Sequence, residues 1–256
     1  MNELNQEKTL FPTQMVELPS KGLVYELESP LSKGMVDIKY MTAKEEDILT
    51  TESYIKTGVV LDKLLESLIV DSNIRQCYQD MLIGDKNALL IAARMYGYGE
   101  EYSMDVTTPS GEKTSITLNL ADLKFKEIDE RLYNNKNEFI FTTPFSKNVI
   151  KFKLMTISDD KKISEKLKKY KSAGARDVQL TERLKRLIIS VDDNSDVNYI
   201  NLFVEKMLAK DSRAFREYMN SIQPNVNMEI ELVDEATGIP FRHPVTIGSS
   251  FFWPDL

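Results

Sequence analysis

The side chains best suited to catalysis in this sequence are one histidine, one cysteine and two pairs of neighbouring acids. The histidine is His243, the cysteine is Cys77, and the acid pairs are Glu45-Glu46 and Asp159-Asp160. Two carboxylates can divide the roles of general acid and base, and a nucleophile needs a base within hydrogen-bonding reach. An enzyme would therefore need Glu45, Asp159 and His243 to converge in one pocket.

The sequence context of each residue favours a structural role. His243 lies in a predicted strand, and Cys77 lies on a predicted helix, where a cysteine more often packs than reacts. The acid pairs stand where helices are predicted to begin, and a helix N-terminus stabilises carboxylates. The Gly-x-Gly of YGYGEE (96–101) lacks the third glycine and the strand–helix setting of a dinucleotide site. We therefore expect no catalytic site and no cofactor.

Two predicted hairpin turns have the shape of zinc-ribbon knuckles without the chemistry. VTTPSG (106–111) and DEATG (234–238) would place metal ligands at Thr107, Ser110, Asp234 and Thr237. A closed zinc site of this kind needs thiolate or imidazole ligands, and these four residues supply neither. We interpret both segments as plain hairpin turns.

The elements around these residues occur twice in the same order. MLIGDKNALLIAARM (81–95) and MLAKDSRAFREYM (207–219) share Met-Leu-x-x-Asp-x-x-Ala at a spacing of 126 residues (207 − 81), with apolar residues at helical intervals. Each is followed by two alternating runs around a glycine turn, which predicts a β-hairpin. Each is preceded by an apolar helix and, further upstream, by a strand leading into an acidic helix start. This ordered repetition indicates an internal duplication.

The repeat predicts an α+β fold of two similar lobes. The N-terminal lobe with an extended arm would span residues 1–127, residues 128–139 would form the joint, and residues 140–256 would form the C-terminal lobe. A period of 126 residues is too long for a solenoid and favours two lobes about a pseudo-twofold axis. Asp85 and Asp211 are predicted N-caps of the repeated helices, since aspartate accepts hydrogen bonds from first-turn N–H groups.

Composition indicates a globular protein with one region of opposite charge. The net charge of −7 disfavours general nucleic-acid binding. The apolar runs are too short to span a membrane, and a single cysteine suits a reducing, intracellular compartment. Residues 161–186 nevertheless hold ten basic and three acidic residues. This stretch is either a solvated face, a docking surface for an acidic partner, or, in an alternative function, a nucleic-acid-binding or regulatory region.

Two segments have compositions that suit partner recognition. An extended arm punctuated by turns contains the LPSKG residues Leu18, Pro19, Ser20, Lys21 and Gly22. The other segment, SSFFWPDL, contains Phe251, Phe252 and Trp253. Soluble proteins seldom leave such a patch uncovered, so these aromatics either fold back as a core strand or insert into a partner, where Trp and Phe are favoured anchors.

Five segments in order complete the interpretation: LPSKGLVY, MTAKEEDIL, YIKTGVVLDKLLESLIV, GDKNALLIAARMYGYG and FFWP. Together they resemble the T-even-type baseplate hub assembly proteins of contractile-tailed bacteriophages, over nearly the whole chain and most strongly over residues 18–99. The resemblance implies a non-enzymatic protein, made in the host cytoplasm, that helps to build the central hub of the tail baseplate with other hub and tail proteins.

The resemblance leaves two points open and does not extend to zinc binding. The protein either stays in the virion as a structural subunit or acts as an assembly chaperone, and it either self-associates or does not. Some family members carry cysteines at the two knuckles, whereas this chain has Thr107, Ser110, Asp234 and Thr237 there, so no zinc role carries over.

Overall fold

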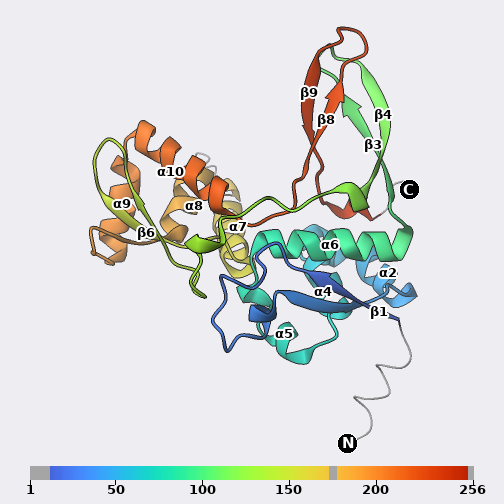
Figure 1. Ribbon diagram of the computed structural model, residues 1–256, viewed down its shortest axis with the longest axis horizontal. Helices are drawn as coiled ribbons and strands as arrows, with labels where there is room; N and C mark the ends of the chain where they lie inside the picture. The colour runs from blue at the N-terminus through green and yellow to red at the C-terminus, as the bar shows by residue number, and fades with distance from the viewer. Residues whose placement is uncertain (1–11, 173–177, 253–256) are drawn as a thin grey trace, which may run out of the picture.

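The computed structural model describes residues 12–172 and 178–252 and shows an α+β protein (Figure 1). Its α-helices are α2 (Ala43–Thr50), α3 (Glu52–Thr57), α4 (Val60–Leu68), α5 (Ser72–Gln76), α6 (Ile83–Tyr98), α7 (Ile157–Ser172), α8 (Gln179–Leu187), α9 (Val197–Lys206) and α10 (Ala209–Ile222). Short 3₁₀ helices are η1 (Pro30–Lys33), η2 (Tyr78–Asp80), η3 (Leu120–Asp122), η4 (Glu130–Leu132) and η5 (Ser249–Phe251). Within these ranges, no helix has both the length and the apolar composition needed to cross a membrane.

The strands form small antiparallel sheets. They are β1 (Thr13–Glu17), β2 (Met35–Lys39), β3 (Glu101–Thr107), β4 (Lys113–Asn119), β5 (Phe139–Thr142), β6 (Val149–Phe152), β7 (Ile188–Val191), β8 (Glu229–Val233) and β9 (Pro240–Pro244). β1 pairs with β2, β3 with β4, β8 with β9, and β5, β6 and β7 form one sheet. Gly111 and Gly238 have positive φ angles of 89° and 70° in the turns of the β3–β4 and β8–β9 hairpins, a conformation that glycine adopts without strain. Both predicted hairpins are confirmed.

The order of elements on the two sides of residues 120–138 is similar. A strand, a helix with an acidic first turn, an amphipathic helix, a longer helix and a hairpin come in this order as β2, α2, α4, α6 and β3–β4, with α3 and α5 between them. The second series is β6, α7, α8, α10 and β8–β9, with β7 and α9 between α8 and α10. Among its described residues the first series has no strand equivalent to β7, but Ile38 and Ile69 form a single bridge there. Their positions correspond to Phe152 and Ile188, which pair between β6 and β7.

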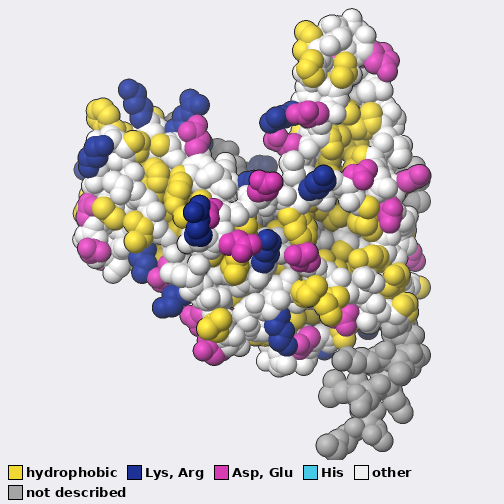
Figure 2. Space-filling model, viewed as in Figure 1, with side chains coloured by type: hydrophobic (Ala, Val, Ile, Leu, Met, Phe, Trp, Pro, Cys, Tyr) yellow, Lys and Arg dark blue, Asp and Glu magenta, His cyan; other side chains and the backbone are white. Residues whose placement is uncertain are grey.

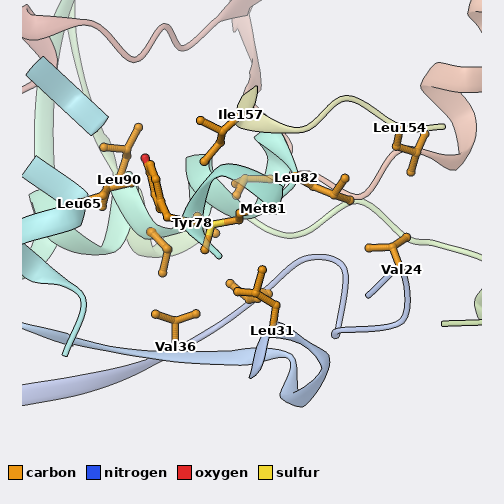
Figure 3. Close-up of a cluster of buried hydrophobic side chains, with 14 of the residues drawn as sticks. Val24, Leu31, Val36, Leu65, Tyr78, Met81, Leu82, Leu90, Leu154 and Ile157 are labelled. Carbon is orange, nitrogen blue, oxygen red and sulfur yellow. The ribbon is translucent and has the colours of Figure 1, made fainter. Parts of the chain in front are cut away.

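One hydrophobic core joins the two series. Leu154 and Ile157 from the second series lie with Tyr78, Met81 and Leu82 of the first (Figure 3). The backbone fixes this contact, since the N–H of Ile83 donates to the carbonyl of Met155 at 3.2 Å and the N–H of Ile157 donates to that of Met81 at 2.9 Å. The two halves therefore share buried apolar surface, which provides most of the driving force for folding.

The close approach of the two series also requires a glycine at the start of α6. A Cβ atom added to Gly84 would lie 1.9 Å from the carbonyl oxygen of Pro224, which follows α10. That distance is well inside van der Waals contact, so only glycine allows α6 to begin against the end of the second series.

The β3–β4 and β8–β9 hairpins project together as an arm (Figure 1). Their turns are joined by Ser110, whose N–H and hydroxyl donate to the carboxylate of Asp234 at 3.0 and 3.1 Å. Figure 2 shows hydrophobic side chains at the end of this arm. Val233 and Ile239, which flank the β8–β9 turn, are 61% and 59% exposed.

The aromatic residues near the chain end are part of the core. Phe251 and Phe252 are fully buried, and the ring of Phe251 lies 4.9 Å from that of Tyr102. The carbonyl of Phe251 accepts a hydrogen bond from Arg94 at 3.1 Å. For these two residues, insertion into a partner was the wrong alternative, and the segment forms η5 rather than a strand because its backbone bonds locally and to Arg94. Trp253 lies outside the described residues.

We expect Phe252→Ala to lower the free energy of unfolding by about 3–5 kcal/mol, because it removes a ring from a closely packed site. Phe145→Ala is the matched control, since Phe145 is 65% exposed and its loss should change stability little. Urea denaturation of both variants measures the difference. Equal midpoints for Phe252→Ala and wild type would show that the ring is not packed in the core.

Candidate functional site

A buried carboxylate, Asp85, anchors the LPSKG segment on α6. It accepts hydrogen bonds from the N–H of Ser20 at 2.9 Å, from the hydroxyl of Ser20 at 2.7 Å and from the hydroxyl of Tyr25. The Tyr25 oxygen in turn accepts the N–H of Leu82 at 2.9 Å. Asp85 is the third residue of α6, and Leu82 occupies the N-cap position. The predicted N-cap role of Asp85 is therefore wrong, because the loop supplies the donors that bind this carboxylate.

Asp211 makes the corresponding contact in the second series. Its carboxylate accepts the N–H groups of Phe145 and Ser146 at 2.9 and 3.1 Å and the Ser146 hydroxyl at 2.6 Å. Asp211 is the third residue of α10, with Leu208 at the N-cap, so its predicted capping role is also wrong. The two serines are separated by the same 126 residues (146 − 20) as the two aspartates (211 − 85).

The pKa values of the two aspartates are shifted in opposite directions. Burial raises the pKa of Asp85 to about 6, and the hydrogen bonds from Tyr25 and Ser20 offset only part of that effect. Burial also disfavours the charge of Asp211, but the bonds from Ser146 and Phe145 outweigh it and lower the pKa. This difference follows the surroundings, since Ser20 and Tyr25 are buried whereas the loop around Ser146 is exposed.

One acid of each pair at the other helix starts, Glu45 and Asp159, is held by hydrogen bonds and ion pairs. Glu45 accepts the N–H and hydroxyl of Thr42 and the hydroxyl of Ser67, and it lies 3.0 Å from the ammonium of Lys39. Burial raises the pKa of Glu45, but the bonds from Thr42, Ser67 and Lys39 prevail and lower it to about 2. The interpretation of this acid as helix-start chemistry is confirmed by its capping box with Thr42.

Asp159, in the first turn of α7, has equivalent partners. It lies 2.8 Å from the ammonium of Lys153 and 2.6 Å from the guanidinium of Arg186, and it accepts the hydroxyl of Thr156. His243 lies on β9 in the arm, opposite Ile230. Within the described ranges, no hydrogen bond or ion pair joins any two of Glu45, Asp159 and His243, so the geometry does not assemble the proposed catalytic set.

The LPSKG segment is an internal element rather than an exposed docking surface. Leu18, Pro19, Ser20 and Gly22 are buried, which contradicts their predicted place in a partner interface. Lys21 is exposed, and its ammonium lies 2.6 Å from the carboxylate of Glu130. Burial follows from the anchoring by Asp85, which draws the segment onto α6.

The hairpin knuckles contact one another through hydrogen bonds. Ser110 and Asp234 meet at the turns, while Thr107 and Thr237 are exposed. Within residues 12–172 and 178–252, no cluster of three or more His, Cys, Asp or Glu side chains has a metal-binding arrangement. Cys77 is half-buried, and burial raises the pKa of its thiol, which lowers the fraction of reactive thiolate.

Several lysines of the basic stretch 161–186 make contacts within the protein. Lys166 lies 2.5 Å from Glu182, and Lys168 donates to the carbonyl of Thr57 at 2.9 Å. Lys185 lies 2.7 Å from Glu205. These cations hold α7 and α8 in place, so the local positive charge is smaller than the sequence alone indicates.

The raised pKa of Asp85 predicts a pH-dependent stability. Between pH 4 and 6 the folded protein keeps a proton that the unfolded chain has released, so this residue makes stability fall as pH rises, by up to about 3 kcal/mol. In Asp85→Asn that contribution should vanish, since the amide is neutral and the hydroxyls of Ser20 and Tyr25 can accept as well as donate. Urea denaturation at pH 4, 5, 6 and 7 compares the two proteins.

Asp211→Asn is the control, because the lowered pKa of Asp211 predicts the opposite dependence, with stability lost as pH falls through the folded-state pKa. If wild type and Asp85→Asn lose stability in parallel from pH 4 to 6, Asp85 does not hold a proton in the folded state.

Comparison with known proteins identifies the family. The model of the family described as T4 bacteriophage base plate protein matches residues 23–253, a range that contains α6, α10, both anchoring aspartates and the arm. No curated protein and no solved structure matches the chain. The family match covers most of the sequence, as the ordered segments predicted, and this chain therefore belongs to the T4 bacteriophage base plate protein family.

Proposed function

We propose that the protein takes part in assembly of the central baseplate hub, without enzymatic activity, as a structural subunit or an assembly chaperone. The observation that carries this proposal is the family match over residues 23–253. The protein is made in the host cytoplasm, binds other hub or tail proteins, and ends in the virion baseplate if it is a structural subunit.

The exposed apolar residues support a role in protein contacts. The outer faces of two sheets each carry two exposed apolar residues on adjacent strands, Met15 and Met35 on β1–β2 and Ile140 and Val149 on β5–β6. The end of the arm adds Val233 and Ile239. Apolar surface on projecting elements is typical of proteins that bury it against partners.

An internal duplication accounts for the repeated contacts. In this proposal, lobes 1–127 and 140–256 descend from one unit, with residues 128–139 as the joint. Support comes from the two aspartate–serine anchors and from the Lys39–Glu45 and Lys153–Asp159 pairs, both 114 residues apart (153 − 39 and 159 − 45). A closed pseudo-twofold would also require Met207–Leu208 to contact Met41–Thr42, and no hydrogen bond between these described residues is present.

A nucleic-acid-binding or regulatory role is the second candidate. It is favoured by Lys161, Lys162, Lys169 and Lys171, which are exposed on α7 and have no ion pair with a described residue. A gel-shift measurement with mixed-sequence DNA at low and high salt tests it, since phosphate contacts weaken steeply with salt. The absence of any shift at low salt would eliminate this role.

Disrupting the gene in the phage that encodes this chain should stop hub formation, and supplying the wild-type chain should restore it. Electron microscopy of lysates detects baseplates, and mass spectrometry of purified baseplates separates the two forms of the proposal: a structural subunit is present in fixed ratio to other components, and a chaperone is absent. Normal hubs and normal infectious titre without the chain would contradict the proposed function.

A further inference from the structure

A groove of about 470 Å³ runs between α8 and α10. Its floor is apolar and includes Leu184, Leu187 and Met219, with Leu154 beside them. Two arginines, Arg183 on α8 and Arg216 on α10, also line it. Leu180 at its edge is 43% exposed. The groove therefore combines apolar and cationic surface from two facing helices.

The corresponding place in the first series is closed. Matching α4 to α8 at a spacing of 119 (184 − 65) puts Leu64 at the position of Arg183, and matching α6 to α10 at 126 puts Leu90 at that of Arg216. Leu64 and Leu90 are both buried. The floor is unchanged, since Leu65 and Leu68 correspond to Leu184 and Leu187.

A pair of stacked tyrosines accounts for a second part of the difference. Tyr40 and Tyr96 stack with ring centroids 5.3 Å apart in the first series. A spacing of 114 (154 − 40) puts Leu154 at the position of Tyr40, and the spacing of 126 (222 − 96) puts Ile222 at that of Tyr96. Smaller side chains there and charged ones at 183 and 216 leave the space between α8 and α10 open. The groove is thus a specific property of the second half.

Most N–H donors of the two arginines are not bonded to a described residue. Arg183 makes no hydrogen bond or ion pair with a described residue, and Arg216 donates only its Nε–H to the carbonyl of Ser212 at 3.3 Å. Of the other charged groups lining the groove, Lys153 is paired with Asp159, and Asp160 is the single acid. The groove is therefore cationic, and neither guanidinium group is paired with an acidic side chain of a described residue.

We propose that this groove binds an acidic, apolar peptide segment of a partner protein. Carboxylates of the segment pair with Arg183 and Arg216, and an apolar side chain between them lies on the floor formed by Leu184 and Met219. Guanidinium groups bind carboxylates through two parallel hydrogen bonds, and the apolar floor adds burial that a phosphate backbone would not use. Asp160 and the lack of aromatic side chains in the groove further disfavour a nucleic acid.

That the partner is a baseplate component rests on the proposed function, but the binding chemistry does not. The probe is a fluorescein-labelled peptide, Glu-Leu-Glu-Leu-Glu, and the readout is fluorescence anisotropy with the purified full chain. Arg183→Leu combined with Arg216→Leu installs the residues of the first series and should lower affinity at least tenfold while leaving the melting temperature equal or higher. Arg213→Leu is the matched control, because Arg213 lies on α10 outside the groove and pairs with Glu217.

Two further peptides separate the apolar contribution to binding from the contribution of charge. Glu-Ser-Glu-Ser-Glu should bind at least tenfold more weakly than the leucine peptide, and Lys-Leu-Lys-Leu-Lys should not bind. Equal affinity of the probe for wild type and the double variant would overturn the proposal, as would displacement of the probe by a single-stranded oligonucleotide at lower concentration than by unlabelled peptide.

A photocrosslinking residue at position 180 identifies the occupant in infected cells. A crosslink to a segment rich in Asp or Glu in another protein supports the proposal, and a crosslink to a second copy of this chain or to a non-acidic segment overturns it. Because peptide binding is measured on the purified chain, it stands or falls separately from hub assembly.

Discussion

The buried carboxylate of Asp85 is the interaction on which the first half of the molecule depends. Removing a carboxylate from water is costly unless donors replace the water, and Ser20 and Tyr25 supply them. Tyr25 also binds the N–H of Leu82, so one network fixes both the LPSKG segment and the start of α6. The adjoining residues, Met81 and Ile83, then make the backbone bonds that attach the second half.

The second half uses the same anchor in a more open setting. Asp211 holds Ser146 as Asp85 holds Ser20, but the chain proceeds at once into β6, without a counterpart of residues 23–34. Phe145 is consequently exposed, and its N–H takes the place of the Tyr25 hydroxyl at the aspartate. The first half is thus specialised for a closed core, and the second half leaves a loop and the α8–α10 groove accessible.

The arm shows how distant segments are combined. The β3–β4 hairpin and the β8–β9 hairpin are separated by more than 100 residues, yet Asp234 of one turn accepts two hydrogen bonds from Ser110 of the other. At the base of the arm, Phe251 packs on Tyr102 and bonds to Arg94. The arm is therefore held at both ends by contacts between the two halves, which suits a projecting element that carries apolar residues at its tip.

The sequence by itself determined the α+β class, the two hairpins and the order of repeated elements, because helical and strand periodicity and glycine turns depend on neighbours in the chain. It also determined the family. Only the tertiary structure decided that Asp85 and Asp211 bind loops instead of capping helices, that LPSKG and Phe251-Phe252 are buried, and that Arg183 and Arg216 face one groove. The hydrogen-bonded contacts join residues 60 or more positions apart, and the two arginines come from separate helices. Periodicity within one segment carries no information about such contacts.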